Sequence, residues 1–285
     1  VAALGAPPST RAEVSGSGAA AQDHSAAAGA GGVAVGGDVG GDVRVVNQLP
    51  EAVLALFARQ FGFDPTASDA AALKAYAEHV LLERHSKLSF LFIRPETGQV
   101  FTEADVETVF VPLRMTDPAA GQHRGRLSQL MERFDRLPRE LEEAARPVTL
   151  PEILQRYPCF LLRGKPGCGK TTLLRHIALA FVRGEHEEKL GWDGPVPLPL
   201  LVSLRNFGAF LKRRAERYVE PQPRALLEYL EEHLRGAGVG FTPSFIPRRL
   251  QAGQCFLLLD ALDEASGTLD GGGDLRAAVA RQVAS

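Results

Sequence analysis

Cysteine is scarce in this sequence, and so is an excess of charge of either sign. Three cysteines among 285 residues do not make a disulfide framework, and the odd count favours a reducing cytoplasm. The 32 Lys and Arg nearly balance the 34 Asp and Glu, which leaves no global electrostatic attraction for nucleic acid or for an anionic membrane. No apolar run approaches the roughly 18 residues of a membrane span, and no basic stretch followed by an apolar block marks a signal peptide.

Aromatic residues are missing from the start of the chain. The first is Phe57, and Ala and Gly make up about half of the first 40 residues. Such a segment cannot bury enough apolar surface to offset the entropy lost on ordering. We therefore expect residues 1–46 to be a low-complexity tail or linker. A Gly-Asp-Val repeat within residues 31–45 leaves a small β element as the alternative.

The next region, residues 47–148, is predicted to be small and mainly helical. Apolar residues at helical spacing predict that residues 48–92 are helical. The run 106–114 favours a strand, and the charge-rich stretch 127–146 favours a solvated helix.

From residue 149 to 285 the pattern is typical of an α/β fold. Thr149 followed by Pro151 and Glu152 predicts a capped short helix ending near Arg156. Strands are then expected at 159–162, 196–204 and 255–259, and helices at 170–183 and 223–235. Strands that alternate with helices imply parallel pairing and a sheet covered on both faces.

The central motif is Gly-Lys-Pro-Gly-Cys-Gly-Lys-Thr at residues 164–171, the spacing of a phosphate-binding loop. Its glycines let successive backbone N–H groups point at phosphate oxygens, and the helix that follows adds its positive end. Lys170 would place a charge on the β- and γ-phosphates, and the Thr171 hydroxyl could bind Mg²⁺. The predicted nucleotide-binding residues are Gly164, Lys165, Pro166, Gly167, Cys168, Gly169, Lys170, Thr171 and Thr172.

Three carboxylates follow the apolar run Leu257–Leu259. Ligands of open α/β sheets bind at the carboxyl ends of the strands, which is where Asp260 is expected. Asp260 could hold Mg²⁺, together with Thr171. Asp263 or Glu264 could polarise a water for attack on a γ-phosphate, which makes them candidate catalytic residues beside Lys170.

Taken in order, these segments resemble a NACHT-type NTPase of the STAND group of signalling P-loop ATPases. Residues 160–175 resemble its first strand, phosphate loop and helix, 198–205 its second strand, and 257–264 its Walker B segment, in which a small residue, Ala261, follows the metal aspartate. Residues 109–114 resemble a strand found ahead of bacterial NACHT modules. The resemblance implies a cytoplasmic ATP- and Mg²⁺-dependent switch with slow hydrolysis, self-association through the NTPase module, and a role in bacterial signalling or defence against phage.

The resemblance also implies that this sequence is a fragment. The family places a fourth strand between its first and third strands, and that strand would follow residue 285. We therefore expect an incomplete sheet, truncated after the Walker B segment.

Three alternatives stay open. A GTPase is disfavoured because neither asparagine, Asn47 or Asn206, lies in an Asn-Lys-x-Asp guanine-reading motif. A mechanical AAA-type ATPase would need an arginine finger and a pore loop. The third alternative is a nucleotide-binding scaffold without turnover. The sequence argues against this alternative, because it retains Lys170, Thr171, Asp260 and Asp263.

Overall fold

The computed structural model describes residues 19–22, 25–28, 48–62, 68–93, 100–117, 146–218, 220, 222–265, 267–268 and 274–284, and the chain divides into two units, 1–47 and 48–285. In the first unit, β1 (Ala19–Gln22) pairs antiparallel with β2 (Ser25–Ala28). The sequence pattern predicted a flexible tail here and gave no sign of this hairpin. The Gly-Asp-Val repeat lies outside the described residues.

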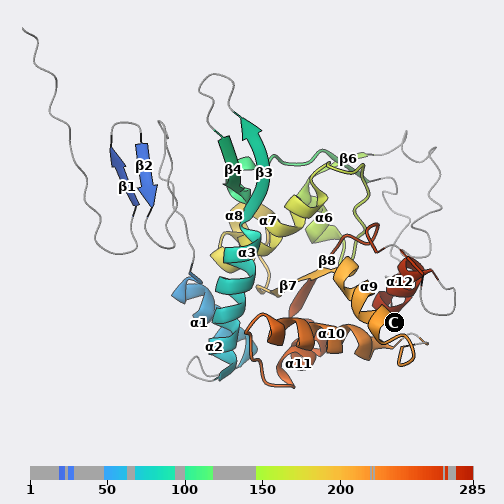
Figure 1. Ribbon diagram of the computed structural model, residues 1–285. Coiled ribbons are helices and arrows are strands. Elements are labelled where there is room, and N and C mark those ends of the chain that lie inside the picture. Colours follow the sequence, from blue (N-terminus) through green and yellow to red (C-terminus); the bar gives the residue numbers. More distant parts are fainter. Residues whose placement is uncertain are drawn as a thin grey trace, which may run out of the picture. The chain divides into compact units, whose positions relative to one another are not determined.

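The second unit opens with helices, as expected (Figure 1). They are α1 (Glu51–Phe61), α2 (Ser68–Ala75), the π-helical turn η1 (Tyr76–Leu82) and α3 (Glu83–His85). The expectation that helix continues to residue 92 is wrong. Residues Lys87–Ile93 form the strand β3, which pairs antiparallel with β4 (Val100–Asp105). A short apolar run suits a strand or a buried helix equally, and periodicity alone does not separate them.

The strand expected at 106–114 is also wrong. Val106–Val109 form the short helix α4, because the Asp105 side chain accepts a hydrogen bond from the Glu107 N–H and caps the helix. Residues 110–114 follow without regular structure, and a strand, β5 (Met115–Asp117), forms only after them, paired antiparallel with β6 (Arg146–Val148). The helix predicted at 127–146 lies outside the described residues except for Arg146, which begins β6.

The α/β part follows the predicted order closely. Thr149 and Glu152 form the capping box of α6 (Leu150–Arg156). Next come α7 (Lys170–Arg183), β7 (Leu198–Ser203), α10 (Pro223–Gly236) and β8 (Cys255–Asp260), and β7 and β8 pair in parallel with Ser203 opposite Asp260. The remaining helices are α8 (His186–Leu190), α9 (Leu204–Arg213), α11 (Phe245–Gln251) and α12 (Leu275–Ala284).

The strand predicted at 159–162 is wrong for the structure as described. These residues are half-buried, and Phe160 and Leu162 pack against the core, but they enter no strand pairing with any described residue. Their apolar character is satisfied by packing alone, whereas a strand also needs a neighbouring backbone to pair with.

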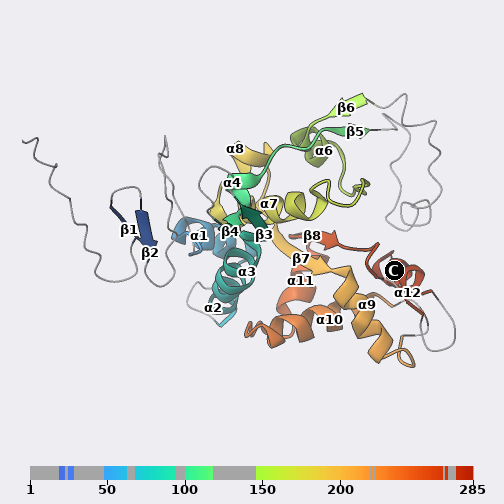
Figure 2. The same cartoon turned by 45° about the horizontal axis from the view of Figure 1, so that its top comes forward.

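Helix α7 lies at the centre of the second unit (Figure 2). It packs on β7 and β8, and it also contacts η1 and α4 from the preceding region. Its buried residues occupy all of its faces, which is typical of a helix enclosed by the fold; they are Leu173, His176, Ile177, Ala178, Leu179, Ala180, Phe181 and Val182. The core is continuous from α1 to α12, so the boundary predicted between residues 148 and 149 stays a prediction.

The free edge of β7 is closed by a side chain instead of a strand. The Tyr76 hydroxyl donates to the Pro199 carbonyl at 2.9 Å and accepts from the Leu201 N–H at 3.4 Å. Pro199 has no N–H to offer a neighbouring strand, which suits an edge position. Burial raises the pKa of the Tyr76 phenol, so that it remains a neutral donor.

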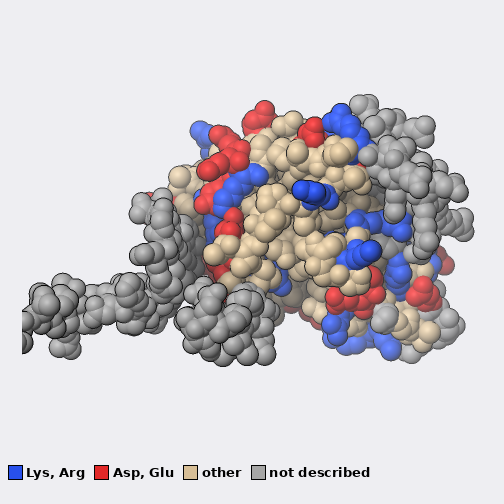
Figure 3. Space-filling view, turned by 90° about the horizontal axis from the view of Figure 1, so that it is seen from above, with Lys and Arg blue, Asp and Glu red and all other residues tan. Residues whose placement is uncertain are grey.

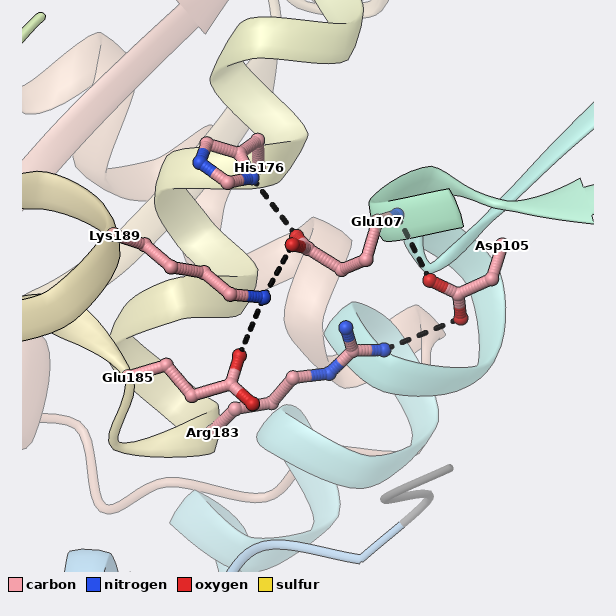
Figure 4. A network of polar contacts seen from close by, with 6 residues as sticks. All are labelled: Asp105, Glu107, His176, Arg183, Glu185 and Lys189. Atoms are coloured by element: carbon pink, nitrogen blue, oxygen red, sulfur yellow. Dashed lines mark hydrogen bonds and ion pairs between the residues drawn. The ribbon is translucent and has the colours of Figure 1, made fainter. Parts of the chain in front are cut away.

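A network of charged groups fastens the segment around α4 to α7 and α8 (Figure 4). The Glu107 carboxylate lies 2.9 Å from His176 Nδ1 and also binds the Lys189 ammonium, which in turn contacts Glu185 at 2.8 Å. Asp105 pairs with Arg183 at 3.3 Å. Burial raises the pKa of Glu107, but the hydrogen bonds from His176 and Lys189 outweigh it and hold that pKa at about 2.

This network predicts a specific pH dependence of stability. The ordinary pKa of Glu107 is 4.5 and the folded value is about 2, so its stabilisation is complete above the first value and is lost as the pH falls through the second. We expect Glu107→Gln to lower the free energy of unfolding by about 1 to 2 kcal/mol near neutral pH, a figure discounted for solvent screening, with the difference from wild type vanishing toward pH 2.

Urea unfolding at a series of pH values measures this difference. Glu103→Gln is the matched control, because Glu103 is exposed on β4 and, among the residues that the structure describes, forms an ion pair with the exposed Lys87 alone. Parallel pH curves for the two variants would contradict the assignment.

Candidate functional site

The loop at residues 164–169 leads directly into the first turn of α7. Gly169 caps the helix with a φ of +91°, and Gly167 has a φ of +77°. Residues other than glycine rarely adopt such backbone conformations. The loop is largely exposed. Because the first N–H groups of a helix have no partner within it, the start of this 14-residue helix is suited to an anion.

Lys170 is folded back over this loop. Its ammonium donates to the carbonyl oxygens of Gly164 at 2.8 Å and Lys165 at 3.1 Å, and lies 3.9 Å from Cys168 Sγ. The positive charge is thus held over the loop that precedes the helix. A phosphate group placed there would find this charge and the helix N–H groups on the same side.

The phosphate-binding loop and the acidic segment after β8 meet at the start of α7, although Thr171 and Asp260 are 89 residues apart in the sequence. The Thr171 hydroxyl donates to Asp260 Oδ1 at 3.1 Å. Thr171 lies in the first turn of α7 and Asp260 is the last residue of β8, so the packing of α7 on β8 brings them together. A hydroxyl and a carboxylate are oxygen ligands of the kind that Mg²⁺ prefers, so this pair fits that ion.

The chain turns sharply after Asp260. Ala261 has a φ of +61°, a left-handed conformation that costs a residue with a side chain roughly 1 kcal/mol, and its carbonyl accepts from the Glu264 N–H at 3.3 Å. Asp263 and Glu264 are exposed in this turn. Glu264 pairs with Arg205 at 3.4 Å, and because both side chains are more than half exposed the pair is weak.

One neighbour of the loop was missed by sequence reasoning. Leu113 packs so close to Gly169 that a Cβ on this glycine would lie 3.2 Å from Leu113 Cδ2. The sequence predicted only a strand for residues 109–114. No pattern within these residues indicates which helix they contact. The sequence also did not identify Glu264 as the ion-pair partner of Arg205.

Comparison with known protein families gives one match. Residues 159–280 match the family described as NACHT domain, and this range contains both the loop and Asp260. The chain contains a NACHT domain. No curated protein and no solved structure matches it significantly.

A NACHT domain is a P-loop NTPase module of the STAND type, so residues 159–280 form a nucleotide-binding unit of mixed α/β structure. Among the described residues, no helix is both long and apolar enough to span a bilayer. On the face shown in Figure 3, Lys and Arg side chains are scattered among uncharged atoms and do not merge into one broad basic surface.

The close packing inside the loop at residues 164–169 can be tested at Gly164. A Cβ on this residue would lie 2.5 Å from Cys168 Sγ, so Gly164→Ala must displace the thiol or the loop. We expect a roughly tenfold loss of nucleotide affinity, about 1.4 kcal/mol, measured by titration with a fluorescent nucleotide.

The double variant Gly164→Ala, Cys168→Ala removes the sulfur atom that causes the collision, and most of the affinity should return. If the double variant binds as weakly as the single one, the collision with Cys168 does not explain the loss.

Proposed function

We propose that the chain binds ATP with Mg²⁺ at residues 164–172 and Asp260, and that it works as a nucleotide-dependent switch. One observation carries this proposal: the Thr171 hydroxyl and the Asp260 carboxylate meet at the start of α7, 3.1 Å apart, beside the Lys170 ammonium. A hydroxyl, a carboxylate and an ammonium at a helix N-terminus are the groups that binding a metal-bound triphosphate requires.

Each residue has a distinct part in this proposal. The loop N–H groups and Lys170 hold the β- and γ-phosphates, and Lys170 leaves the carbonyls of Gly164 and Lys165 to do so. Thr171 and Asp260 hold Mg²⁺, which would neutralise phosphate charge when bound. Their present hydrogen bond keeps both oxygen atoms on the same side of the loop.

Slow hydrolysis would depend on the turn after β8. Asp263 and Glu264 are the candidates to orient a water molecule. Glu264 is engaged by Arg205, and because this pair is exposed and weak it can be exchanged for a water molecule at little cost. Because Glu264 is paired with Arg205 in the structure, it must first be released, which agrees with slow turnover.

The wider role rests on the family rather than on this site. By likeness to NACHT proteins, we propose that the nucleotide controls self-association, in bacterial signalling or defence in the cytoplasm. In this proposal residues 149–285 are the NTPase domain, residues 47–148 a preceding region and residues 1–46 a linker. The two nucleotide states would switch the protein through their different affinities for its two conformations.

A scaffold that binds nucleotide without turnover is the second candidate. It would hold if Arg205 stayed paired with Glu264 when nucleotide is bound, because the carboxylate would then not be available to orient a water molecule. Comparing ATP with GTP in the same assay tests the further alternative of a GTPase.

The proposal is tested by Lys170→Ala in a titration with fluorescent ATP and Mg²⁺. We expect a loss of affinity of at least a hundredfold, since the substitution removes a charge-assisted contact to phosphate. Lys212→Ala is the matched control, because it removes the same charge from an exposed position on α9. Equal binding by wild type and Lys170→Ala would overturn the proposal.

Turnover separates the two candidates. Glu264→Gln should retain ATP affinity and lose phosphate release if Glu264 orients the attacking water. Binding without phosphate release in the wild-type chain would favour the scaffold.

A further inference from the structure

Residues 110–114, here called the strap, run along α7 toward the phosphate-binding loop. At one end, Phe110 stacks on His176 in the second turn of α7, with ring centroids 3.8 Å apart and planes within 7°. At the other end, Leu113 lies against Gly169, the N-cap of α7, so that a Cβ on this glycine would be 3.2 Å from Leu113 Cδ2. The strap thus connects the side of the helix to the loop.

The side chains of the strap divide into those that pack and those that do not. Phe110 and Leu113 are half-buried against the core, whereas Val111 between them is 73% exposed. The packing of the strap therefore depends on Phe110 and Leu113, whereas the apolar side chain of Val111 points to solvent.

Both ends of the strap are fixed. Before it, Glu107 binds His176 and Lys189, and Asp105 pairs with Arg183. After it, Met115 is buried and pairs with Val148 across β5 and β6, and β6 continues into the capped helix α6. These attachments hold both ends of the strap beside α7.

The packing of Leu113 restricts where the backbone at Gly169 can lie. Phosphate binding requires Lys170, the next residue, to leave the carbonyls of Gly164 and Lys165. A Cβ on Gly169 would lie 3.2 Å from Leu113 Cδ2, so little free space separates the two residues and the start of α7 is held in place by this packing. Two events that share one contact are coupled, and the coupling acts equally in both directions.

We propose that the strap positions the phosphate-binding loop for nucleotide, with Leu113 packed on Gly169 and Phe110 on His176 as its two points of contact. This inference rests on the proposed nucleotide site and adds a positioning residue, Leu113, that lies outside the loop and outside residues 159–280. The docked strap favours the loop conformation that accepts phosphate, and bound nucleotide in turn favours the docked strap.

The test is the affinity for ATP with Mg²⁺ of Leu113→Ala against Val111→Ala, measured in the full chain. We expect Leu113→Ala to bind at least fivefold more weakly than wild type, within the usual range of coupling between sites, and Val111→Ala to bind as wild type. Leu113→Met keeps the apolar volume and should restore the affinity. Equal affinities for the Ala variants at 111 and 113 would overturn the proposal.

Hydrogen exchange keeps the inference testable if Leu113→Ala does not fold. In wild type, ATP with Mg²⁺ should slow exchange of the amides at 110–114, and Lys170→Ala should abolish that change. Nucleotide binding without any change at 110–114 would refute the strap alone, whereas no binding to wild type would refute the nucleotide site on which it rests. A purely structural Leu113 would lower the melting temperature without altering the affinity of the folded protein.

Discussion

The burial of α7 is the constraint on which the rest of the second unit depends. Residues on all faces of this helix are enclosed, by β7 and β8 on one side and by η1 and α4 on another. Its first turn remains accessible at the exposed loop. A helix held so firmly gives its N-terminal N–H groups a fixed direction, which is what a site that works through positioned charge requires.

The region before the NACHT match is built into this arrangement rather than attached to it. Tyr76 closes the edge of β7, and Glu107 anchors the strap through His176. The partly buried ion pairs of Glu107 and Asp105 stabilise the fold and also specify where the strap lies. The same contacts that complete the fold therefore bring Leu113 to the loop.

The sequence predicted the parts of the fold that have a local cause. The glycine loop and α7, the capping box of α6, and the apolar strands β7 and β8 were all identified, because each carries its own pattern over adjacent residues. The segments 87–92, 106–114 and 159–162 were assigned wrongly, since a short apolar run takes its structure from its neighbours. The meeting of Thr171 with Asp260 could be inferred from the order of strands and helices, whereas the contact of Leu113 with Gly169 could not, because it depends on how the strap docks.

The most direct test of this account is hydrogen exchange of the wild-type chain with Mg²⁺ alone, with ATP alone and with both. The account predicts that exchange slows at 164–172 and at 257–261 together, and most with ATP and Mg²⁺ combined, because the proposed Mg²⁺ site uses both Thr171 and Asp260. The buried part of α7, 173–183, should change little, since it is already protected. Slower exchange at 164–172 with no change at 257–261, or no change at either, would contradict it.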